Sequence, residues 1–228
     1  METHNIQGIL WDMDGVLVET GELHYLTWKS TMALNNVHID RAFFKRTFGM
    51  NNWGALTELF GELPDKAWCE RFIDQKEAAF RDLARGNLKP LEGVLQVLLH
   101  FQQQGLKQAV ATSAPAENMR LILDELGINQ YFDAAISAAN WPGKPNPMVF
   151  LEAAKALGLP PENCLVFEDA IAGVQAAHRA GMPCIAITTT NTAADLAAAE
   201  LVIDRYDQLG NCQIDSINSL IKLAPGMK

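Results

Sequence analysis

Residues 9–15 read ILWDMDG, and this short stretch decides the fold of the 228-residue chain. Three large apolar residues are followed at once by two acids and a glycine, which indicates a buried strand that ends in a polar loop. A buried strand so early in the chain favours the central position of a parallel sheet. The residues on either side of it must then supply the rest of that sheet.

The segment that follows, from about residue 22 to residue 85, has a helical pattern. Its first part places apolar residues on one side of a helix, namely Leu23, Leu26, Met32 and Leu34. Its last part, residues 68–83, repeats this spacing with Phe72, Ala79, Phe80 and Leu83. No strand pattern interrupts the segment, so the sequence predicts an all-helical insert.

From residue 91 onward, apolar runs of strand length alternate with helical patterns. The expected strands are 108–112, 134–137, 164–167, 184–187 and 201–203. The expected helices are 93–104, 117–126, 146–157 and 173–180, each closed by a glycine at 105, 127, 158 or 181. This alternation predicts an α/β fold with a Rossmann-like parallel sheet core and a helical cap inserted after the first strand. We place the core at residues 1–18 and 89–228 and the cap at residues 19–88. The cap should act as a lid, because open α/β sheets bind ligands beyond the carboxyl ends of their strands.

Composition excludes several classes of function. The formal net charge is −9, and no run of lysine and arginine breaks it, so we expect no nucleic-acid partner. No segment is long and apolar enough for a signal peptide or a membrane span, which favours a cytoplasmic protein without a membrane partner. We expect a monomer or small homo-oligomer, although the sequence shows no interface. The four cysteines, Cys69, Cys164, Cys184 and Cys212, lack metal-ligand or paired spacing and are expected to be reduced, and mostly buried.

Two of the four candidate sites lie at the ends of the first two core strands. Asp12 and Asp14 follow the first strand, where one carboxylate can attack phosphorus while the other handles a proton. An ordinary Asp-Gly turn would look the same. Thr112 and Ser113 follow the next strand and offer a hydroxyl and backbone N–H groups to a phosphate, although a plain helix N-cap is the alternative.

The other two candidates come later in the chain. Lys144 lies in the sequence GKPNP, where prolines stiffen the backbone and direct the lysine, although a solvated turn is the alternative. Glu168 and Asp169 end a buried strand and suggest ligands for a hard cation, with a helix-start acid as the alternative. The order of the four features along successive strands makes a chance arrangement improbable.

With these four features in this order, the chain resembles the haloacid dehalogenase superfamily, in the subgroup with a helical cap after the first strand. The similarity spans nearly the whole chain. Residues 12–20, DMDGVLVET, look like the first motif of that superfamily, and Thr112, Lys144 and the pair Glu168-Asp169 look like the second, third and fourth.

The resemblance implies a mechanism. Asp12 attacks the phosphoryl group and forms an aspartyl-phosphate, while Asp14 protonates the leaving oxygen and then activates water. It also implies a bound Mg²⁺ and a phosphate site. The implied metal ligands are Asp12, Asp14 through its backbone carbonyl, Asp169, and Glu168 nearby or through water; the implied phosphate-binding residues are Thr112, Ser113 and Lys144. The cation and the lysine would offset the repulsion between carboxylate and phosphate.

Within the superfamily the chain looks like the subgroup of β-phosphoglucomutase and sugar-phosphate phosphatases. Thr20, His24 and Trp28 match its Thr-x-x-x-His-x-x-x-Trp pattern, although His24 could merely pack at the hinge. The candidates for contacting substrate from the cap are Thr20, His24, Asn51, Asn52 and Lys76, the last of which could instead be solvated. By our alignment Asn52 takes the place of an arginine that grips the second phosphate in the mutase.

These expectations favour a Mg²⁺-dependent phosphatase that hydrolyses a small phosphorylated metabolite, such as a sugar phosphate. The alternatives are a β-phosphoglucomutase-type phosphomutase and a binding protein without catalysis. The sequence does not name the substrate, because specificity in such folds depends on the cap and the loops facing it.

Overall fold

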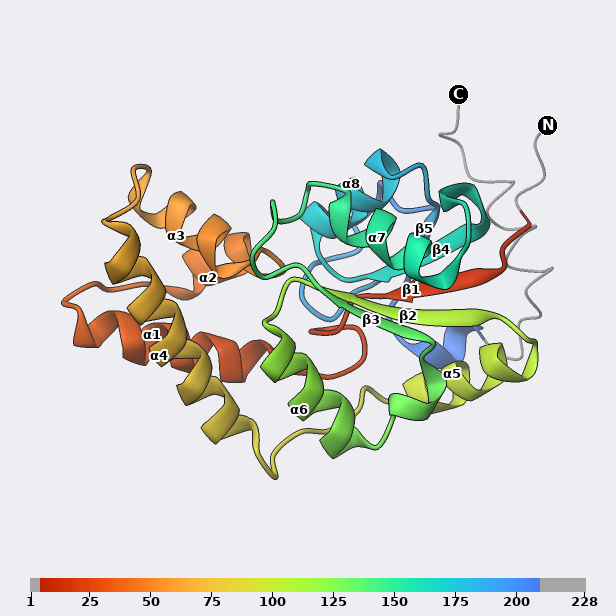
Figure 1. Cartoon of the computed structure of the whole chain (residues 1–228), viewed down its shortest axis with the longest axis horizontal. Helices are drawn as coiled ribbons and strands as arrows, with labels where there is room; N and C mark the ends of the chain where they lie inside the picture. The colour runs from red at the N-terminus through yellow and green to blue at the C-terminus, as the bar shows by residue number, and fades with distance from the viewer. Residues whose placement is uncertain (1–4, 210–228) are drawn as a thin grey trace.

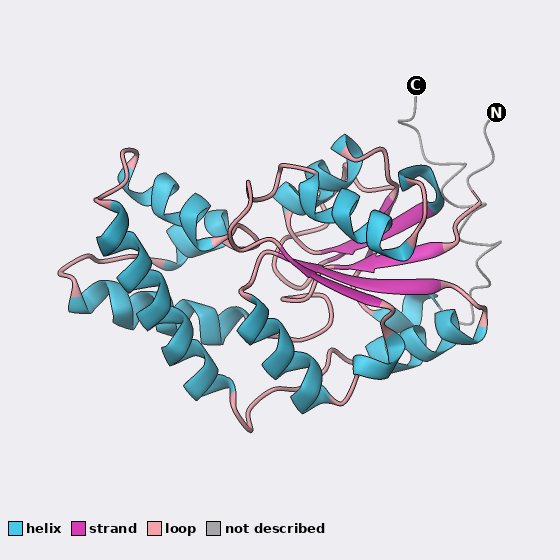
Figure 2. Cartoon of the chain, in the orientation of Figure 1, coloured by secondary structure: helices cyan, strands magenta, loops and turns pink. Residues whose placement is uncertain are grey.

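The computed structural model describes residues 5–209. Six parallel strands form one sheet in the order β3-β2-β1-β4-β5-β6 (Figure 2). The strands are β1 (Gly8–Trp11), β2 (Lys107–Thr112), β3 (Ala134–Ser137), β4 (Cys164–Glu168), β5 (Cys184–Ile187) and β6 (Leu201–Ile203). The predicted α/β fold class is confirmed, including the central place of the first strand.

β1 lies between β2 and β4, and its four residues are all buried. Trp11 pairs in register with Val110 of β2 and Phe167 of β4, so the strands end side by side. A strand covered by helices on both faces has no solvent face, which explains why β1 is apolar throughout. The residues just after these strands therefore emerge at one edge of the sheet.

Helices cover both faces of this sheet (Figure 1). They are α5 (Val94–Gln103), α6 (Ala116–Leu126), α7 (Met148–Leu157) and α8 (Ile171–Arg179). One face has an aromatic core in which the rings of Trp11 and Phe167 stack at 4.3 Å, and the other packs Leu10 and Phe150 among smaller side chains. Burial of this apolar surface stabilises the core.

The remaining helices form the cap, which lies beyond the carboxyl ends of the strands (Figure 1). They are α1 (Gly21–Leu34), α2 (Arg41–Thr47), α3 (Asn52–Phe60) and α4 (Lys66–Ala84). The cap has its own apolar cluster, which includes Trp28, Met32 and Phe72. The position of the helical cap after the first strand is confirmed, and the exact boundaries at residues 18/19 and 88/89 stay a prediction.

Most predicted elements occur within two residues of their predicted ends. The predicted glycine stops at Gly127 and Gly158 have left-handed backbones that end α6 and α7. One prediction about the cap was wrong: Leu26 and Leu34 do not face its core but are 43% and 71% exposed. The buried face of α1 is instead made largely of polar and aromatic side chains, because it borders the functional site described below.

Three of the cysteines, Cys69, Cys164 and Cys184, are buried and free, as expected, and Cys212 lies outside the described residues. Within residues 5–209, no helix has the length and apolarity that a bilayer crossing requires.

Candidate active site

The candidate site lies where β1, β2 and β4 end. Asp12 follows β1 directly, Thr112 is the last residue of β2, and Glu168 is the last residue of β4. The backbone N–H of Asp12 still donates to the carbonyl of Phe167 at 3.0 Å, so the loop starts in register with the sheet. The parallel topology thus brings together the first, second and fourth predicted features.

Lys144 reaches this cluster from the loop before α7. Its Nζ lies 2.5 Å from Oδ1 of Asp12 and 2.5 Å from Oε1 of Glu168, with all three side chains buried. Burial alone would lower the pKa of Lys144, but the two carboxylates raise it above its ordinary value. The lysine is therefore a fixed positive charge beside Asp12.

Asp169 adds a third carboxylate to this cluster, next to the single positive charge of Lys144. Carboxylate oxygens of Asp12, Glu168 and Asp169 lie within 4.8 Å of one another, and all three residues are buried. Oδ2 of Asp169 accepts hydrogen bonds from the hydroxyls of Thr189 and Thr190, whereas its buried Oδ1 has no hydrogen-bond partner among residues 5–209.

Three buried carboxylates beside one lysine are unfavourable unless a cation joins them. Burial raises the pKa of Asp12 to about 7 despite Lys144, and burial with the neighbouring carboxylates raises the pKa of Asp169 well above its usual range. Oxygen ligands on carboxylates are those that Mg²⁺ prefers. The unpartnered Oδ1 and this donor set therefore fit a hard divalent cation.

Two glycines make room for the cluster. A Cβ atom at Gly15 would overlap the carboxylate of Asp169, and a Cβ at Gly173 would overlap the carboxylate of Glu168. Gly15 also has a φ of +83°, a backbone conformation that favours glycine. Gly173 lies inside α8, where alanine is ordinarily preferred, so its presence is explained by the close approach of Glu168.

Thr112 and Ser113 lie between β2 and α6. The Thr112 hydroxyl oxygen accepts from the backbone N–H of Ala114 at 3.0 Å, while the buried Ser113 Oγ has no hydrogen-bond partner in the part of the chain that the structure describes. Both residues line the same cavity as Asp12, with α6 beginning three residues later. A hydroxyl without a partner beside a helix start suits an anionic ligand.

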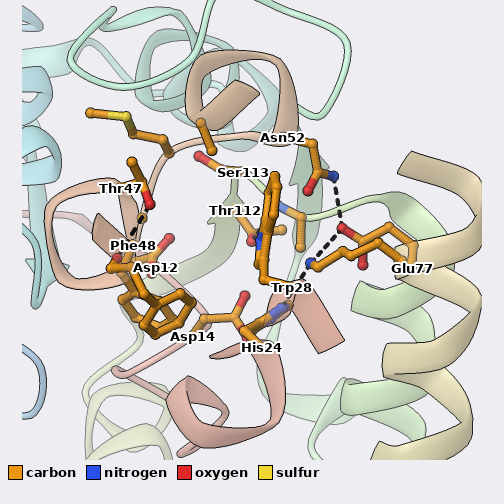
Figure 3. Close-up of a pocket in the computed structure, with 16 residues that line it drawn as sticks. Asp12, Asp14, His24, Trp28, Thr47, Phe48, Asn52, Glu77, Thr112 and Ser113 are labelled. Carbon is orange, nitrogen blue, oxygen red and sulfur yellow. Dashed lines mark hydrogen bonds and ion pairs between the residues drawn. The ribbon is translucent and has the colours of Figure 1, made fainter. Parts of the chain in front are cut away.

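Asp14 is turned toward the cap. Its Oδ1 accepts from the Thr20 hydroxyl and lies 3.3 Å from Nε2 of His24. Figure 3 shows the side chains of Asp14 and His24 next to each other. Burial would raise the pKa of Asp14, but His24 and Thr20 outweigh it and hold that pKa below its ordinary value. Thr20 and His24 are thus next to a predicted catalytic carboxylate.

The other cap candidates divide into two groups. Lys76 lies 3.0 Å from Nδ1 of His24, and Asn52 donates to Glu77, so both face the cavity. Asn51 does not: its Oδ1 caps α3 by accepting from the N–H of Gly54, and its Nδ2 donates to the carbonyl of Trp141. Asn51 therefore joins the cap to the core outside the cavity.

The cavity between cap and core measures about 50 Å³. Sites for small-molecule ligands typically measure ~300–1,000 Å³. Its lining residues include Asp12, Asp14, Thr112 and Ser113 from the core together with His24, Trp28, Phe48, Asn52, Lys76 and Glu77 from the cap (Figure 3). In this structure the side chains of the cap and the core therefore leave little space between them.

The sequence prediction missed several residues that hold this site. Thr189 and Thr190 contact Asp169, and Asn191 donates to its carbonyl. These residues follow β5, so the rule that strand ends meet at one edge could have found them. Glu77 and Asn118 carried no comparable signal, because neither lies near a strand end in a recognisable motif.

A helical cap closed over a Rossmann-like core, with buried carboxylates and a lysine at the strand ends, defines an enzyme of the capped α/β class. The family model described as haloacid dehalogenase-like hydrolase matches residues 9–187, and the chain belongs to this family.

Individual relatives and solved structures agree with this placement. The chain is 30% identical to fructose-1-phosphate phosphatase from Escherichia coli, over 78% of this chain and 94% of that protein. It is 29% identical to the chloroplastic 5-amino-6-(5-phospho-D-ribitylamino)uracil phosphatase from Arabidopsis thaliana, over 95% of this chain but only 57% of that longer protein. The crystal structure of β-phosphoglucomutase from Clostridium difficile superposes with a TM-score of 0.84 and 26% identity, covering 95% of this chain and 97% of that one.

Proposed function

We propose that this protein is a Mg²⁺-dependent phosphatase that hydrolyses a small phosphate monoester through an aspartyl-phosphate on Asp12. The observation that carries the proposal is the position of Asp12, which is buried 2.5 Å from Lys144 and beside the unpartnered Oδ1 of Asp169. A carboxylate can approach a phosphate dianion only where positive charge offsets their repulsion. Lys144 supplies part of that charge.

In the first step a carboxylate oxygen of Asp12 bonds to phosphorus while the bond from phosphorus to the ester oxygen breaks. The leaving oxygen takes a proton from Asp14, which restores a neutral hydroxyl. Thr112 and Ser113 would donate to the phosphoryl oxygens from the end of the neighbouring strand β2, and Lys144, held beside Asp12, would supply positive charge to the same oxygens. The cap excludes bulk water during this step.

In the second step Asp14 accepts a proton from a water molecule, whose oxygen then attacks the aspartyl-phosphate and releases inorganic phosphate. The contacts from Thr20 and His24 favour the ionised form of Asp14, which is the form a general base needs. For the first step Asp14 must carry a proton, and a bound phosphate dianion nearby raises its pKa in that direction.

The residues that would hold the cation are Asp12, the backbone carbonyl of Asp14 and Asp169, with Glu168 beside them. A bound Mg²⁺ would neutralise negative charge on the phosphoryl group and on these carboxylates. Glu168 has little capacity left to bind the cation. Its Oε1 accepts from Lys144, and its Oε2 accepts from the N–H groups of Asp169 and Ala170. Its main role would be to orient Lys144.

A second candidate function is a phosphomutase, favoured by the similarity to a β-phosphoglucomutase structure. Such an enzyme must keep a bisphosphate bound while it turns over. Within the described range, the residues that line the cavity include no arginine, and the one lysine, Lys76, is paired with Glu77. We therefore favour hydrolysis over transfer.

Phosphate release from p-nitrophenyl phosphate and from hexose phosphates, with Mg²⁺ and with EDTA, tests the proposal. We expect turnover only with Mg²⁺ and none for Asp12→Ala; full activity of that variant would show that the nucleophile is wrong. Incubation of β-glucose 1-phosphate with a bisphosphate primer separates the alternatives. Conversion to glucose 6-phosphate without free phosphate would favour the mutase.

The natural partner in this proposal is a small phosphorylated metabolite. The predictions of a cytoplasmic location, of a monomer or small homo-oligomer, and of no nucleic-acid or membrane partner stay predictions.

A further inference from the structure

Glu77 is a buried carboxylate of the cap that lines the same cavity as Asp12. Its Oε1 accepts from Nζ of Lys76 at 2.9 Å and from Nδ2 of Asn52 at 2.7 Å (Figure 3). Its Oε2 accepts from Nδ2 of Asn118, on the core helix α6, at 2.6 Å. Burial would raise the pKa of Glu77, but Lys76 and His24 lower it to about 2, so Glu77 is charged at neutral pH.

This arrangement cancels the positive charge of the cap wall. Nζ of Lys76 lies 3.0 Å from Nδ1 of His24 and 2.9 Å from Oε1 of Glu77. Lys76 and Glu77 form a buried ion pair without net charge. The remaining polar groups of the wall, on Asn52 and Trp28, are uncharged.

A second phosphate at this wall would meet the fixed carboxylate of Glu77, and among residues 5–209 the one lysine that lines the cavity, Lys76, is already paired with that carboxylate. Charges interact strongly in a closed cavity because little water screens them. Lys144 and the predicted cation lie at the other end, around Asp12, where they would serve the reacting phosphoryl group. The cap end of the cavity is thus unfavourable for an anion.

The same wall offers hydrogen-bonding groups that suit hydroxyls. Asn52 uses one N–H on Glu77, and its Oδ1 has no partner within residues 5–209. Lys76 uses two of its three hydrogens, on His24 and Glu77. Trp28 also lines the cavity, and its indole N–H is a further hydrogen-bond donor of this wall.

We propose that the cap wall selects phosphate monoesters whose other end carries hydroxyl groups and no second anionic group, and that Glu77 is the residue that excludes the second anion. The inference rests on the proposed phosphatase function and narrows its substrates to polyhydroxylated monophosphates. It assigns Glu77 a role in specificity, acting through charge, rather than a step in the reaction.

The test compares kcat/KM for matched pairs: fructose 1-phosphate with fructose 1,6-bisphosphate, and glucose 1-phosphate with glucose 1,6-bisphosphate. We expect the wild type to favour the monophosphate by about tenfold or more, the effect of one unfavourable charge contact. Glu77→Gln should lower the ratio of kcat/KM for the monophosphate to kcat/KM for the bisphosphate, mainly by lowering KM for the bisphosphate. The matched control is Glu70→Gln on the same helix, where the exposed Glu70 forms an ion pair with Lys66 at 3.6 Å. This control should leave the ratio unchanged.

A wild type that turns over both members of each pair equally would overturn the inference, and so would an unchanged ratio in folded Glu77→Gln. If circular dichroism shows that Glu77→Gln does not fold, Asn52→Arg takes its place. That substitution adds a cation beside Glu77 and should narrow the ratio in the same direction, and an unchanged ratio would again overturn the inference. If no ester of either kind releases phosphate with Mg²⁺, the proposed function itself fails, and this result differs from turnover without discrimination.

Discussion

Nε2 of His24 lies 3.3 Å from Oδ1 of Asp14, so a residue of the cap contacts a carboxylate of the loop that follows the central strand. The ring of His24 is fixed by stacking on Phe80, with centroids 4.0 Å apart, and by Lys76 on its other nitrogen. The geometry of Asp14 is therefore tied to cap closure.

We expect His24→Ala to lower kcat about 10- to 100-fold, the scale on which a misplaced general acid–base group affects rate. The reason is that Asp14 loses one of its two side-chain partners in the closed form. Steady-state kinetics with p-nitrophenyl phosphate measure this decrease in kcat. The control is the same change in an Asp14→Asn background, where it should have no further effect. Additive losses in the double variant would contradict a role through Asp14.

The unpartnered Oδ1 of Asp169 predicts a stabilising effect of Mg²⁺. A cation that binds only the folded state raises Tm, by about 2–4 °C for each kcal/mol of binding free energy in a chain of this size. Asp169→Asn should abolish this increase and, in EDTA, should melt higher than the wild type because one buried charge is removed.

Differential scanning fluorimetry with Mg²⁺ and with EDTA measures both effects. Asp82→Asn is the control, since Asp82 is an exposed carboxylate paired with Arg85 and should keep the wild-type response. An Asp169→Asn variant that still gains stability from Mg²⁺ would place the cation elsewhere.

Substitution by alanine should affect the stability of the protein differently at two helical glycines, Gly21 and Gly173. In a helix, alanine is favoured over glycine by up to about 1 kcal/mol, and a Cβ at Gly21 would meet nothing within 4 Å. Gly21→Ala should therefore be neutral or slightly stabilising. Gly173→Ala should cost about 1–3 kcal/mol, because its Cβ overlaps the carboxylate of Glu168.

Urea denaturation of the two variants measures the change in the free energy of unfolding that each substitution causes. Because Glu168 holds Lys144, Gly173→Ala should also reduce activity, whereas Gly21→Ala should not. Equal stability of both variants would mean that Glu168 moves aside without cost.

The residues of the candidate site could be predicted from the sequence, because the ends of neighbouring strands in a parallel sheet lie at the same edge. The acidic pair after β1, the hydroxyl after β2 and the acids after β4 each follow an apolar run, so their meeting needs no knowledge of side-chain packing. Lys144 lies in the loop before α7, and it was predicted for a different reason, from its place in the order of motifs. The roles assigned to these residues stay predictions.

The cap was harder to predict, since its helices pack against each other at angles that periodicity does not set. Leu26 and Leu34 continue the apolar pattern of α1, yet both are exposed, because the helix turns His24 and Trp28 inward toward the cavity. Glu77 was missed because a glutamate on a helix is ordinarily solvated. Its burial depends on three partners from three different helices, which a linear pattern does not reveal.

Glu77 also predicts how stability changes in acid. Its pKa is lowered from 4.5 to about 2, so the folded state binds this proton more weakly than the unfolded state. The stabilisation is present above the unfolded pKa and is lost as the pH falls toward the folded pKa. Between pH 5 and pH 3 the wild type should lose about 2 kcal/mol from this group alone.

The comparison of unfolding free energies at pH 5 and pH 3 isolates this contribution. Glu77→Gln, which has no proton to gain, should show a smaller loss than the wild type by roughly that 2 kcal/mol, whatever its stability at pH 5. Glu70→Gln, at the exposed position on the same helix, should keep the full wild-type loss. If Glu77→Gln and the wild type lost the same free energy, the carboxylate of Glu77 would not be held charged by Lys76, and the neutral cap wall described above would have no basis.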